Sequence, residues 1–359
     1  MRFYFLVDPL IATHGSVTPA ILLGKKFIYY DEVEIVSPFI SKDVERYLND
    51  IGFYMNNMNK HYKLNGSLLT LESWFHPLDF KNGKEDEIII NFSQCFDCKA
   101  DIYYAPGPIT FALDDIYPWM RGIYKIVYKS LKAFINSRDR MFNERIRKQT
   151  KLFIAVSNYT AELYKRLNIN VEGVLYPPID LDTFKPSTSK PSEDYILTYI
   201  GKETRFDILN KIAKNDIRIK GFGSKVSYIP SYIRKNPNIE LLGRVTDDEL
   251  VELYSNALYT LFPFTHEPFG YIPIESMACS TPVLTYNRQG PAETVNNDIG
   301  WAVNNDNEMV NLAIRLWNNG YDKKIRMRCK EYSIEFGIDN IAEKWKVILT
   351  QLIDSQQSL

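Results

Sequence analysis

Short apolar runs alternate with longer segments whose apolar residues recur at helical spacing along most of the chain. The runs that predict strands in the first half are 2–7, 33–37, 87–92, 101–104, 152–156 and 173–176. Those in the second half are 195–200, 239–242, 257–263, 282–286 and 301–303. Strands that alternate with helices predict parallel sheets covered by helices on both faces, which is the α/β class.

A stretch rich in Pro, Ser and Asp separates the two halves. Its sequence, LYPPIDLDTFKPSTSKPSEDY, is typical of a linker. The 359 residues also exceed one typical core. We therefore expect two doubly wound, Rossmann-like domains at residues 1–180 and 181–335. A final helix within residues 336–359 has apolar residues at helical spacing, among them Trp345.

The bulk composition narrows the function classes. The formal net charge is −1 and 24% of the residues are charged, so we expect no nucleic-acid partner. No signal peptide and no apolar run of about 18 residues is present, which predicts a cytoplasmic protein without a membrane span. Cys95 and Cys98 form a lone C-x-x-C without further ligands at zinc spacing, so we interpret them as reduced thiols.

The segment HEPFGYIPIESMACSTPVL carries the most specific chemistry. It places Glu267 and Glu275 eight positions apart, after an apolar run at 258–264 and around the start of a helical pattern at 272–279. A strand, a glycine turn and a helix aim free backbone N–H groups and the helix dipole at an anion. Carboxylates at the same place can accept hydrogen bonds from hydroxyls. Together these features predict a nucleotide sugar, whose diphosphate lies between a ribose and a hexose.

This segment resembles the paired-glutamate E-x7-E motif of the retaining family-4 glycosyltransferases, which have the GT-B fold. The resemblance implies that Glu267 contacts the donor sugar and Glu275 the ribose. It also implies two Rossmann-like domains that face a cleft, with the last helix crossing back to the first domain. Ser280 stands where the family usually has glycine. The alternative interpretation of this segment is an ordinary amphipathic helix with exposed glutamates and no ligand. Further stretches that resemble the family are 175–184, 238–245, 247–250, 290–295 and 298–300, whereas the first half resembles it only loosely.

Transfer from a nucleotide sugar requires stabilisation of the negative charge that grows on the diphosphate. The N–H groups of Phe269, Gly270 and Tyr271 are predicted to contribute. The family places two basic residues after the first strand of the second domain, where Lys202 and Arg205 follow Gly201. Arginine suits bidentate phosphate binding and lysine a point contact. The alternative for both is a solvated loop.

No metal or other cofactor is expected. Asp180-x-Asp182 fits a short triplet that holds a metal-bound diphosphate in another glycosyltransferase fold. Because the triplet lies within the linker pattern, we reject that interpretation. With Lys202 and Arg205 as the cations, we expect a metal-independent reaction.

Two further regions are predicted to approach the donor. After the first strand the family has a glycine-rich turn, and here Gly15 and Ser16 stand there, with Ser16 as a helix cap. His14 lies beside them as a candidate cleft residue. The nucleobase is expected near Val245, held by backbone groups.

A basic amphipathic segment lies between Arg121 and Lys151. It contains ten lysines or arginines and two acids, and its apolar residues recur at helical spacing. Such a segment suggests an anionic membrane surface, used to reach lipid-linked acceptors. The equally weighted alternative is a helix on its own sheet with a solvated cationic face.

The sequence therefore predicts a retaining glycosyltransferase that moves a hexose from a UDP- or GDP-linked donor to an acceptor hydroxyl. The predicted acceptor is a glycan, lipid-linked or on protein, and the predicted location is cytoplasmic, with peripheral association with the inner membrane face left open. A nucleotide-sugar epimerase of the same fold and a catalytically inactive sugar-nucleotide-binding subunit are the alternatives.

Overall fold

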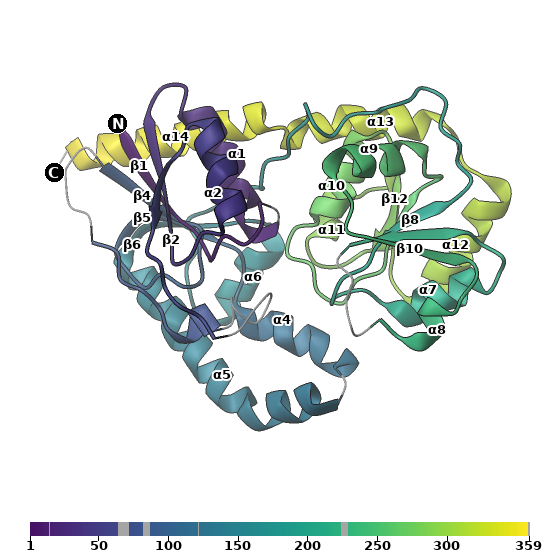
Figure 1. The fold of residues 1–359 in the computed structure, drawn as a ribbon, viewed down its shortest axis with the longest axis horizontal. Helices are drawn as coiled ribbons and strands as arrows, with labels where there is room; N and C mark the ends of the chain where they lie inside the picture. Colours follow the sequence, from purple (N-terminus) through teal and green to yellow (C-terminus); the bar gives the residue numbers. More distant parts are fainter. Residues whose placement is uncertain (14, 64–71, 82–86, 121, 224–228, 358–359) are drawn as a thin grey trace. The chain divides into compact units, whose positions relative to one another are not determined.

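The computed structural model describes residues 1–13, 15–63, 72–81, 87–120, 122–223 and 229–357. The chain divides into a first unit, Met1–Pro178 with Ile341–Leu359, and a second unit, Ile179–Asn340. Each unit is a sheet with helices on its faces (Figure 1).

The first unit is organised around a parallel sheet with strand order β3-β2-β1-β4-β5-β6-β7 among the described residues. These strands are β1 Arg2–Leu6, β2 Glu32–Ser37, β3 Tyr54–Asn57, β4 Glu87–Asn91, β5 Ala100–Ala105, β6 Thr150–Ala155 and β7 Gly173–Val174. All pair in parallel. The central strands are buried along nearly their whole length, as expected for a parallel sheet covered on both faces.

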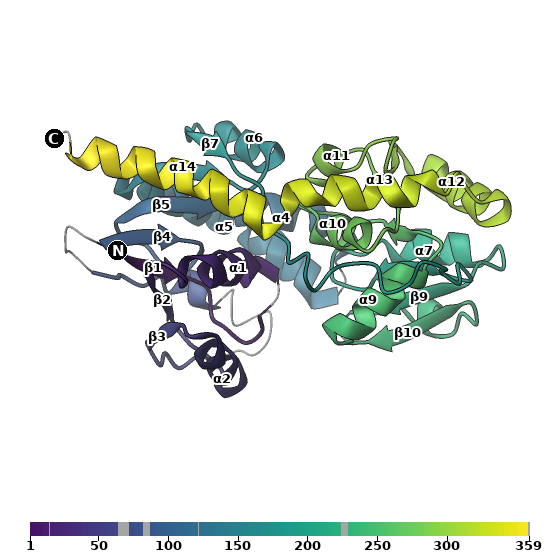
Figure 2. The same ribbon diagram turned by 90° about the horizontal axis from the view of Figure 1, so that it is seen from above.

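The helices of this unit cover the sheet and extend beyond it. They are α1 Thr18–Phe27, α2 Lys42–Ile51, α4 Ile109–Ile116, α5 Gly122–Gln149, α6 Asn158–Arg166 and most of α14 Ile338–Gln357, with the short 3-10 turns η1 Gly15–Val17 and η2 Tyr117–Trp119. On α14, Trp345 is fully buried, and its ring lies 5.4 Å from that of Tyr104 and 6.1 Å from that of Phe92. This ring cluster holds α14 along the first sheet (Figure 2).

The second unit repeats the scheme with strand order β10-β9-β8-β11-β12-β13, again all parallel. Its strands are β8 Ile196–Tyr199, β9 Ile219–Phe222, β10 Ile239–Gly243, β11 Thr260–Phe262, β12 Val283–Tyr286 and β13 Gly300–Val303. Its helices are α7 Phe206–Ala213, α8 Ser231–Arg234, α9 Asp247–Asn256, α10 Tyr271–Ala278, α11 Pro291–Thr294, α12 Asp306–Asn319 and α13 Lys324–Ser333, followed by the 3-10 turn η3 Ile334–Phe336.

Two strands were not predicted from the sequence. β3 is an edge strand whose sequence, YMNN, is too polar to give a strand signal. β9 has the sequence IKGF, in which a lysine and Gly221 interrupt the apolar run. A Cβ atom on Gly221 would lie 2.7 Å from Cγ1 of Ile200, so the glycine is required by close packing rather than by a turn.

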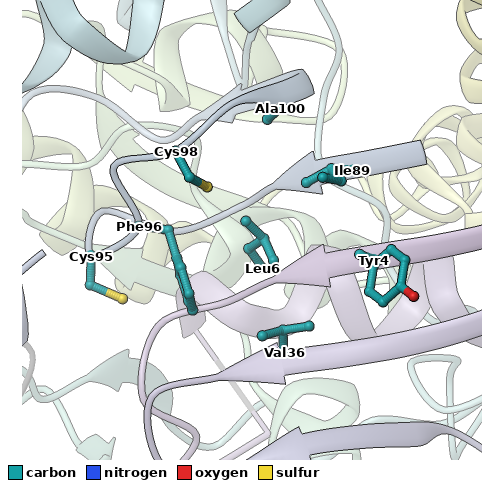
Figure 3. Packing of buried hydrophobic residues seen from close by; sticks show 8 residues of the cluster. All are labelled: Tyr4, Leu6, Val36, Ile89, Cys95, Phe96, Cys98 and Ala100. Carbon is teal, nitrogen blue, oxygen red and sulfur yellow. The ribbon is translucent and has the colours of Figure 1, made fainter. Parts of the chain in front are cut away.

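The two cysteines of the C-x-x-C motif belong to the core of the first unit. Cys95 and Cys98 are free thiols with 0% and 2% exposure. They lie among Tyr4, Leu6 and Phe96 (Figure 3). Burial raises the pKa of the Cys98 thiol to about 11, which keeps it protonated at neutral pH. Among the described residues, no helix is both long and apolar enough to span a membrane.

Candidate active site

The candidate site lies where the strand order of the second sheet reverses. From β8 the chain runs outward through β9 and β10, and β11 then returns to the other side of β8. In open α/β sheets the carboxyl ends of the two strands at this point border the usual ligand crevice. The loop at 200–205 follows β8, and the loop at 263–270 follows β11. Both predicted groups of donor ligands in this unit therefore lie at the same edge.

These two loops are joined by backbone hydrogen bonds. The N–H of Arg205 donates to the carbonyl of Pro263 at 2.9 Å, and the N–H of Thr265 donates to the carbonyl of Glu203 at 2.8 Å. Thr204 and Phe264 form an antiparallel bridge between them. The loops consequently form one backbone platform, and the side chains of residues 202, 203 and 267 are carried on it.

Glu267 is half-buried and is held by the turn that follows it. Its Oε1 atom accepts hydrogen bonds from the N–H groups of Gly270 at 3.1 Å and Phe269 at 3.4 Å. Its own N–H donates to Oε1 of Gln289 at 2.7 Å. Burial, followed by the charge of Glu203, raises the pKa of Glu267 to about 7.

Glu275 lies within α10, on the other side of the same turn. The hydroxyl of the fully buried Tyr254, on α9, donates to its Oε2 atom at 3.0 Å. Burial raises the pKa of Glu275 to about 7, and Asp247 adds to the effect. Neither glutamate is an ordinary exposed helix residue, because both are half-buried and have specific hydrogen-bond donors.

The glycine turn has the geometry expected from the motif. Gly270 has φ +104°, in the left-handed region, and α10 begins directly after it at Tyr271. Pro273 lies in the first turn of the helix, where it breaks no helical hydrogen bond. At the end of the same helix Ser280 has φ +63°, the conformation for which glycine is the usual choice. The serine thus preserves the turn despite its departure from the family pattern.

The two predicted cations have different surroundings. Lys202 is 62% exposed, and its Nζ atom lies 3.5 Å from Oε1 of Glu203. Arg205 is only 7% exposed, and its guanidinium makes bidentate contacts with both Asp207 and Asp306, at 2.6–3.2 Å. The structure therefore gives Arg205 two carboxylate partners that sequence reasoning did not foresee, and its role with diphosphate stays a prediction.

The remaining predicted donor ligands are more loosely placed. Val245 is half-buried and packs against the same apolar cluster as Ile272 of α10. Gly15 and Ser16 lie in the first unit, where both are exposed and Gly15 has φ +83°. Ser16 does not cap α1: it lies within η1, and the residue that precedes the helix is Val17, which makes no side-chain cap. His14 lies outside the described residues.

Asp180 and Asp182 occupy a turn of their own. Oδ1 of Asp180 accepts from the N–H groups of Asp182 and Thr183 at 3.0 and 3.2 Å, and Oδ2 accepts from the hydroxyl of Thr183 at 3.0 Å. The carboxylate of Asp180 is thus occupied by its own backbone, as is typical of an Asx turn. No group of three or more potential metal ligands was found among the described residues.

Sequence reasoning missed three side chains that contact or influence the glutamates. They are Glu203, Tyr254 and Gln289. Glu203 directly follows Lys202, so its neighbourhood was visible in the motif, but its effect on Glu267 depends on the joined loops. Tyr254 and Gln289 reach the site from α9 and from the loop after β12, and no spacing in the sequence indicates such contacts.

Comparisons with known proteins agree with this geometry. Residues 206–336 match the family described as "Glycosyl transferases group 1". The chain is 28% identical over 194 residues to the alpha-1,3/1,6-mannosyltransferase ALG2 of Yarrowia lipolytica, covering 54% of this chain and 35% of that protein. It is 27% identical over 128 residues to the capsular polysaccharide biosynthesis glycosyltransferase CapM of Staphylococcus aureus, covering 31% and 33%. The chain thus spans about a third of the length of these two curated relatives.

Solved structures share the whole fold. HepE of Anabaena, in complex with UDP and glucose, aligns with a TM-score of 0.70 and 15% identity, covering 98% of this chain and 99% of that one. WaaG, a glycosyltransferase involved in lipopolysaccharide biosynthesis, aligns with a TM-score of 0.67 and 15% identity, covering 98% and 100%. The predicted GT-B fold with two Rossmann-like domains is confirmed. On this fold, residues 206–336 are similar to the family of group 1 glycosyl transferases.

Proposed function

We propose that the protein is a retaining, metal-independent glycosyltransferase that moves a hexose from a nucleotide-diphosphate sugar to an acceptor hydroxyl. The observation that carries the proposal is the arrangement at the strand-order reversal of the second sheet. Two half-buried glutamates, Glu267 and Glu275, lie on either side of the glycine turn that precedes α10. Lys202 lies on the loop after β8, which is hydrogen-bonded to the loop that carries Glu267. The relative named as a mannosyltransferase and the neighbour in complex with UDP and glucose support the hexosyltransferase part of the proposal.

In this proposal each group has a separate task. Glu267 accepts hydrogen bonds from hydroxyls of the hexose, and Glu275 accepts them from the ribose. Lys202 and the N–H groups of the turn stabilise the charge that develops on the leaving diphosphate. Because this charge is met by a side-chain ammonium and backbone dipoles, activity should persist in EDTA. Loss of activity with EDTA that Mn²⁺ or Mg²⁺ restores would contradict metal independence.

Donor binding is tested by thermal unfolding with UDP-glucose and GDP-mannose as probes. A ligand that binds only the folded state raises the melting temperature. Glu275→Ala should lower donor affinity by about 10-fold, because it leaves hydroxyls of the ribose without an acceptor. Glu240→Ala, which removes an exposed carboxylate from β10, is the matched control. Unchanged affinity in a folded Glu275→Ala variant would refute the ribose assignment. Anomeric NMR of the product tests retention.

We further propose that the protein reaches its acceptor at an anionic membrane through α5. The N-terminal half of this helix, which lies beside α4 (Figure 1), exposes many large apolar side chains. Ile123 is 65% exposed, Ile126 64% and Phe134 57%, and Trp119 just before the helix is 46% exposed. We call this set the α5 apolar strip: Trp119, Ile123, Tyr124, Ile126, Val127, Leu131, Phe134 and Met141.

Other residues of α5, spaced seven positions apart, face its own unit. Tyr128, Ile135 and Phe142 are buried. The helix therefore has buried apolar residues and, in addition, the exposed α5 apolar strip. A helix that only packs on its own sheet and exposes a solvated cationic face would not be expected to have such a strip. Exposed apolar patches of this kind mark membrane or partner interfaces, and aromatic side chains such as Trp119 suit the bilayer interface.

The lysines of α5 differ in their availability. Lys132 pairs with Asp114 at 2.5 Å, and Lys125 donates to the carbonyl of Pro118 at 3.3 Å. Both hold α5 against the preceding segment. Lys129 is exposed and makes no side-chain hydrogen bond or ion pair within the part of the chain that the structure describes. Of the three lysines in the N-terminal half of α5, Lys129 is therefore the one that best reports on lipid charge.

Cosedimentation with vesicles tests this surface. We expect binding to phosphatidylglycerol at low salt, weaker binding at high salt and none to phosphatidylcholine. Ile123→Ser with Ile126→Ser should remove most of the binding, and Lys129→Glu should weaken it, whereas Val347→Ser, an exposed control on α14, should not. Absence of wild-type binding to phosphatidylglycerol at low salt would contradict the membrane proposal and favour a water-soluble glycan or protein acceptor.

A further inference from the structure

The groups proposed to hold the donor diphosphate are already engaged by carboxylates of the chain itself. The ammonium of Lys202 lies 3.5 Å from Oε1 of Glu203. The N–H groups of Phe269 and Gly270 donate to Oε1 of Glu267. A diphosphate that uses the same donors must take the place of these two carboxylates.

Glu203 is held in this position by its backbone rather than by its side chain. Its carbonyl accepts from the N–H of Thr265 at 2.8 Å and from the hydroxyl of Thr265 at 3.2 Å. These bonds fix residue 203 on the platform formed by the two loops. Its side chain is 24% exposed, and its charge is, after burial, the largest cause that raises the pKa of Glu267.

Other charged or titratable groups around this point come from β8 and from the loop after β12. Burial, followed by the charges of Glu203, Glu267 and Glu275, raises the pKa of Tyr199 on β8 to about 12. Arg288, after β12, donates to the carbonyl of Phe264 at 2.8 Å and lies over the ring of Tyr286. Arg288 thus has partners of its own, whereas Glu203 pairs with Lys202.

We infer that Glu203 is a positioning residue that acts as an internal stand-in for the donor diphosphate, holding Lys202 over the site and releasing it when the nucleotide binds. The inference rests on the proposed function of the same site. Binding then exchanges one anion for another at Lys202, and Glu267 is free to turn from its own loop to hydroxyls of the sugar. The exchange keeps the cation ordered, but Glu203 competes with the nucleotide.

Competition between Glu203 and the nucleotide predicts the direction in which a substitution of Glu203 changes nucleotide affinity. If Glu203 competes, Glu203→Gln strengthens nucleotide binding, because glutamine is isosteric and leaves the backbone bonds to Thr265 intact. An exposed ion pair is weak, so we expect about two- to fivefold tighter binding of UDP at low salt. The gain should shrink at high salt, since screening weakens both the ion pair and the repulsion of UDP.

The experiment is isothermal titration of the full chain with UDP, which lacks the sugar and reports on the diphosphate. Wild type, Glu203→Gln and the matched control Glu240→Gln are compared at low and high salt, with near-UV circular dichroism as the check on folding. Glu203→Ala, which also removes the carboxylate, should likewise bind UDP more tightly than the wild type. Lys202→Met alone should weaken binding, and in that background Glu203→Gln should lose most of its effect, because the two residues act as a pair.

Three outcomes would overturn the inference. Weaker binding in Glu203→Gln would make Glu203 a direct aid to the nucleotide. Equal gains in UDP affinity in Glu203→Gln and Glu240→Gln would show that the effect comes from the net charge of the protein. An undiminished gain in the Lys202→Met background would show that Glu203 does not act through Lys202. Absence of UDP binding by the wild type, with GDP also failing, would instead count against the proposed function.

Discussion

Glu267→Gln is the substitution whose effect on stability the structure fixes most sharply. The Glu267 carboxylate is half-buried, its Oε1 atom accepts two backbone N–H groups, and its pKa is raised to about 7. Glutamine keeps the volume and the accepting oxygen but never ionises. The variant should therefore differ from the wild type only where the wild-type group carries a charge.

The sign and size follow from linkage. A folded-state pKa of about 7 against an ordinary value of 4.5 means that the folded protein binds more protons than the unfolded chain between these values. The unfolding free energy of the wild type must then fall as the pH rises through this window. For this one group the cost is about 1 kcal/mol at pH 5 and about 3 kcal/mol at pH 8.5. Glu267→Gln should remove it and so gain more stability at the higher pH.

The assay is urea unfolding followed by circular dichroism at pH 5 and pH 8.5. Glu240→Gln serves as the control, because it removes an exposed carboxylate of the same unit. We expect Glu267→Gln to exceed the wild type by about 2 kcal/mol more at pH 8.5 than at pH 5. A variant that is less stable than the wild type at pH 8.5 would show that the ionised carboxylate stabilises the turn, and would refute the reasoning from burial. Glu267→Gln should also bind the donor more weakly than the wild type, because Glu267 is proposed to accept hydrogen bonds from the hexose.

Three further substitutions test other parts of the chain. Trp345→Ala should lower the unfolding free energy of the first unit by about 3–5 kcal/mol in urea, because a fully buried indole leaves a cavity. Arg205→Met should lower stability by about 1–3 kcal/mol, because Asp207 and Asp306 lose their partner. If Arg205 also binds the diphosphate, UDP affinity measured by titration calorimetry should fall about tenfold, and an unchanged affinity would contradict that role. Ser280→Gly should raise the unfolding free energy by up to about 1 kcal/mol, since it relieves a left-handed φ of +63°; no gain in urea unfolding would contradict that strain.

Most of the fold was predictable because its signals are local. Each strand with a continuous apolar sequence was identified, as in β1 and β4. The strands that were missed lack this signal: β3 is polar, and β9 contains a lysine and a glycine. In β9 the glycine is required by the side chain of Ile200, which approaches it from the neighbouring chain segment. A contact between residues that are distant in sequence cannot be read from the spacing of one segment.

The site was predictable to a similar extent and for similar reasons. The turn at Gly270 and the start of α10 were visible because a strand, a glycine and a helix follow one another in the sequence. The contact of Arg205 with Asp306 was not visible, because Asp306 lies 101 residues further along the chain. The prediction that Ser16 caps α1 was wrong because the chain makes a 3-10 turn before the helix begins. Local motifs therefore predict a turn and the start of a helix more reliably than they predict the long-range contacts of the side chains in them.

The stability and the proposed chemistry of the site are coupled through its carboxylates. Glu267 and Glu275 each have a pKa raised to about 7 by burial, so holding both as anions near neutral pH costs folding free energy. Hydroxyl groups of a bound nucleotide sugar would donate to these anions and offset that cost. Donor binding should then stabilise the second unit more at pH 8.5, where both glutamates are ionised, than at pH 6, where both are largely protonated. The rise in melting temperature with UDP-glucose, measured at the two pH values, would reveal this coupling, and an equal rise at both would separate donor binding from the charge of the two glutamates.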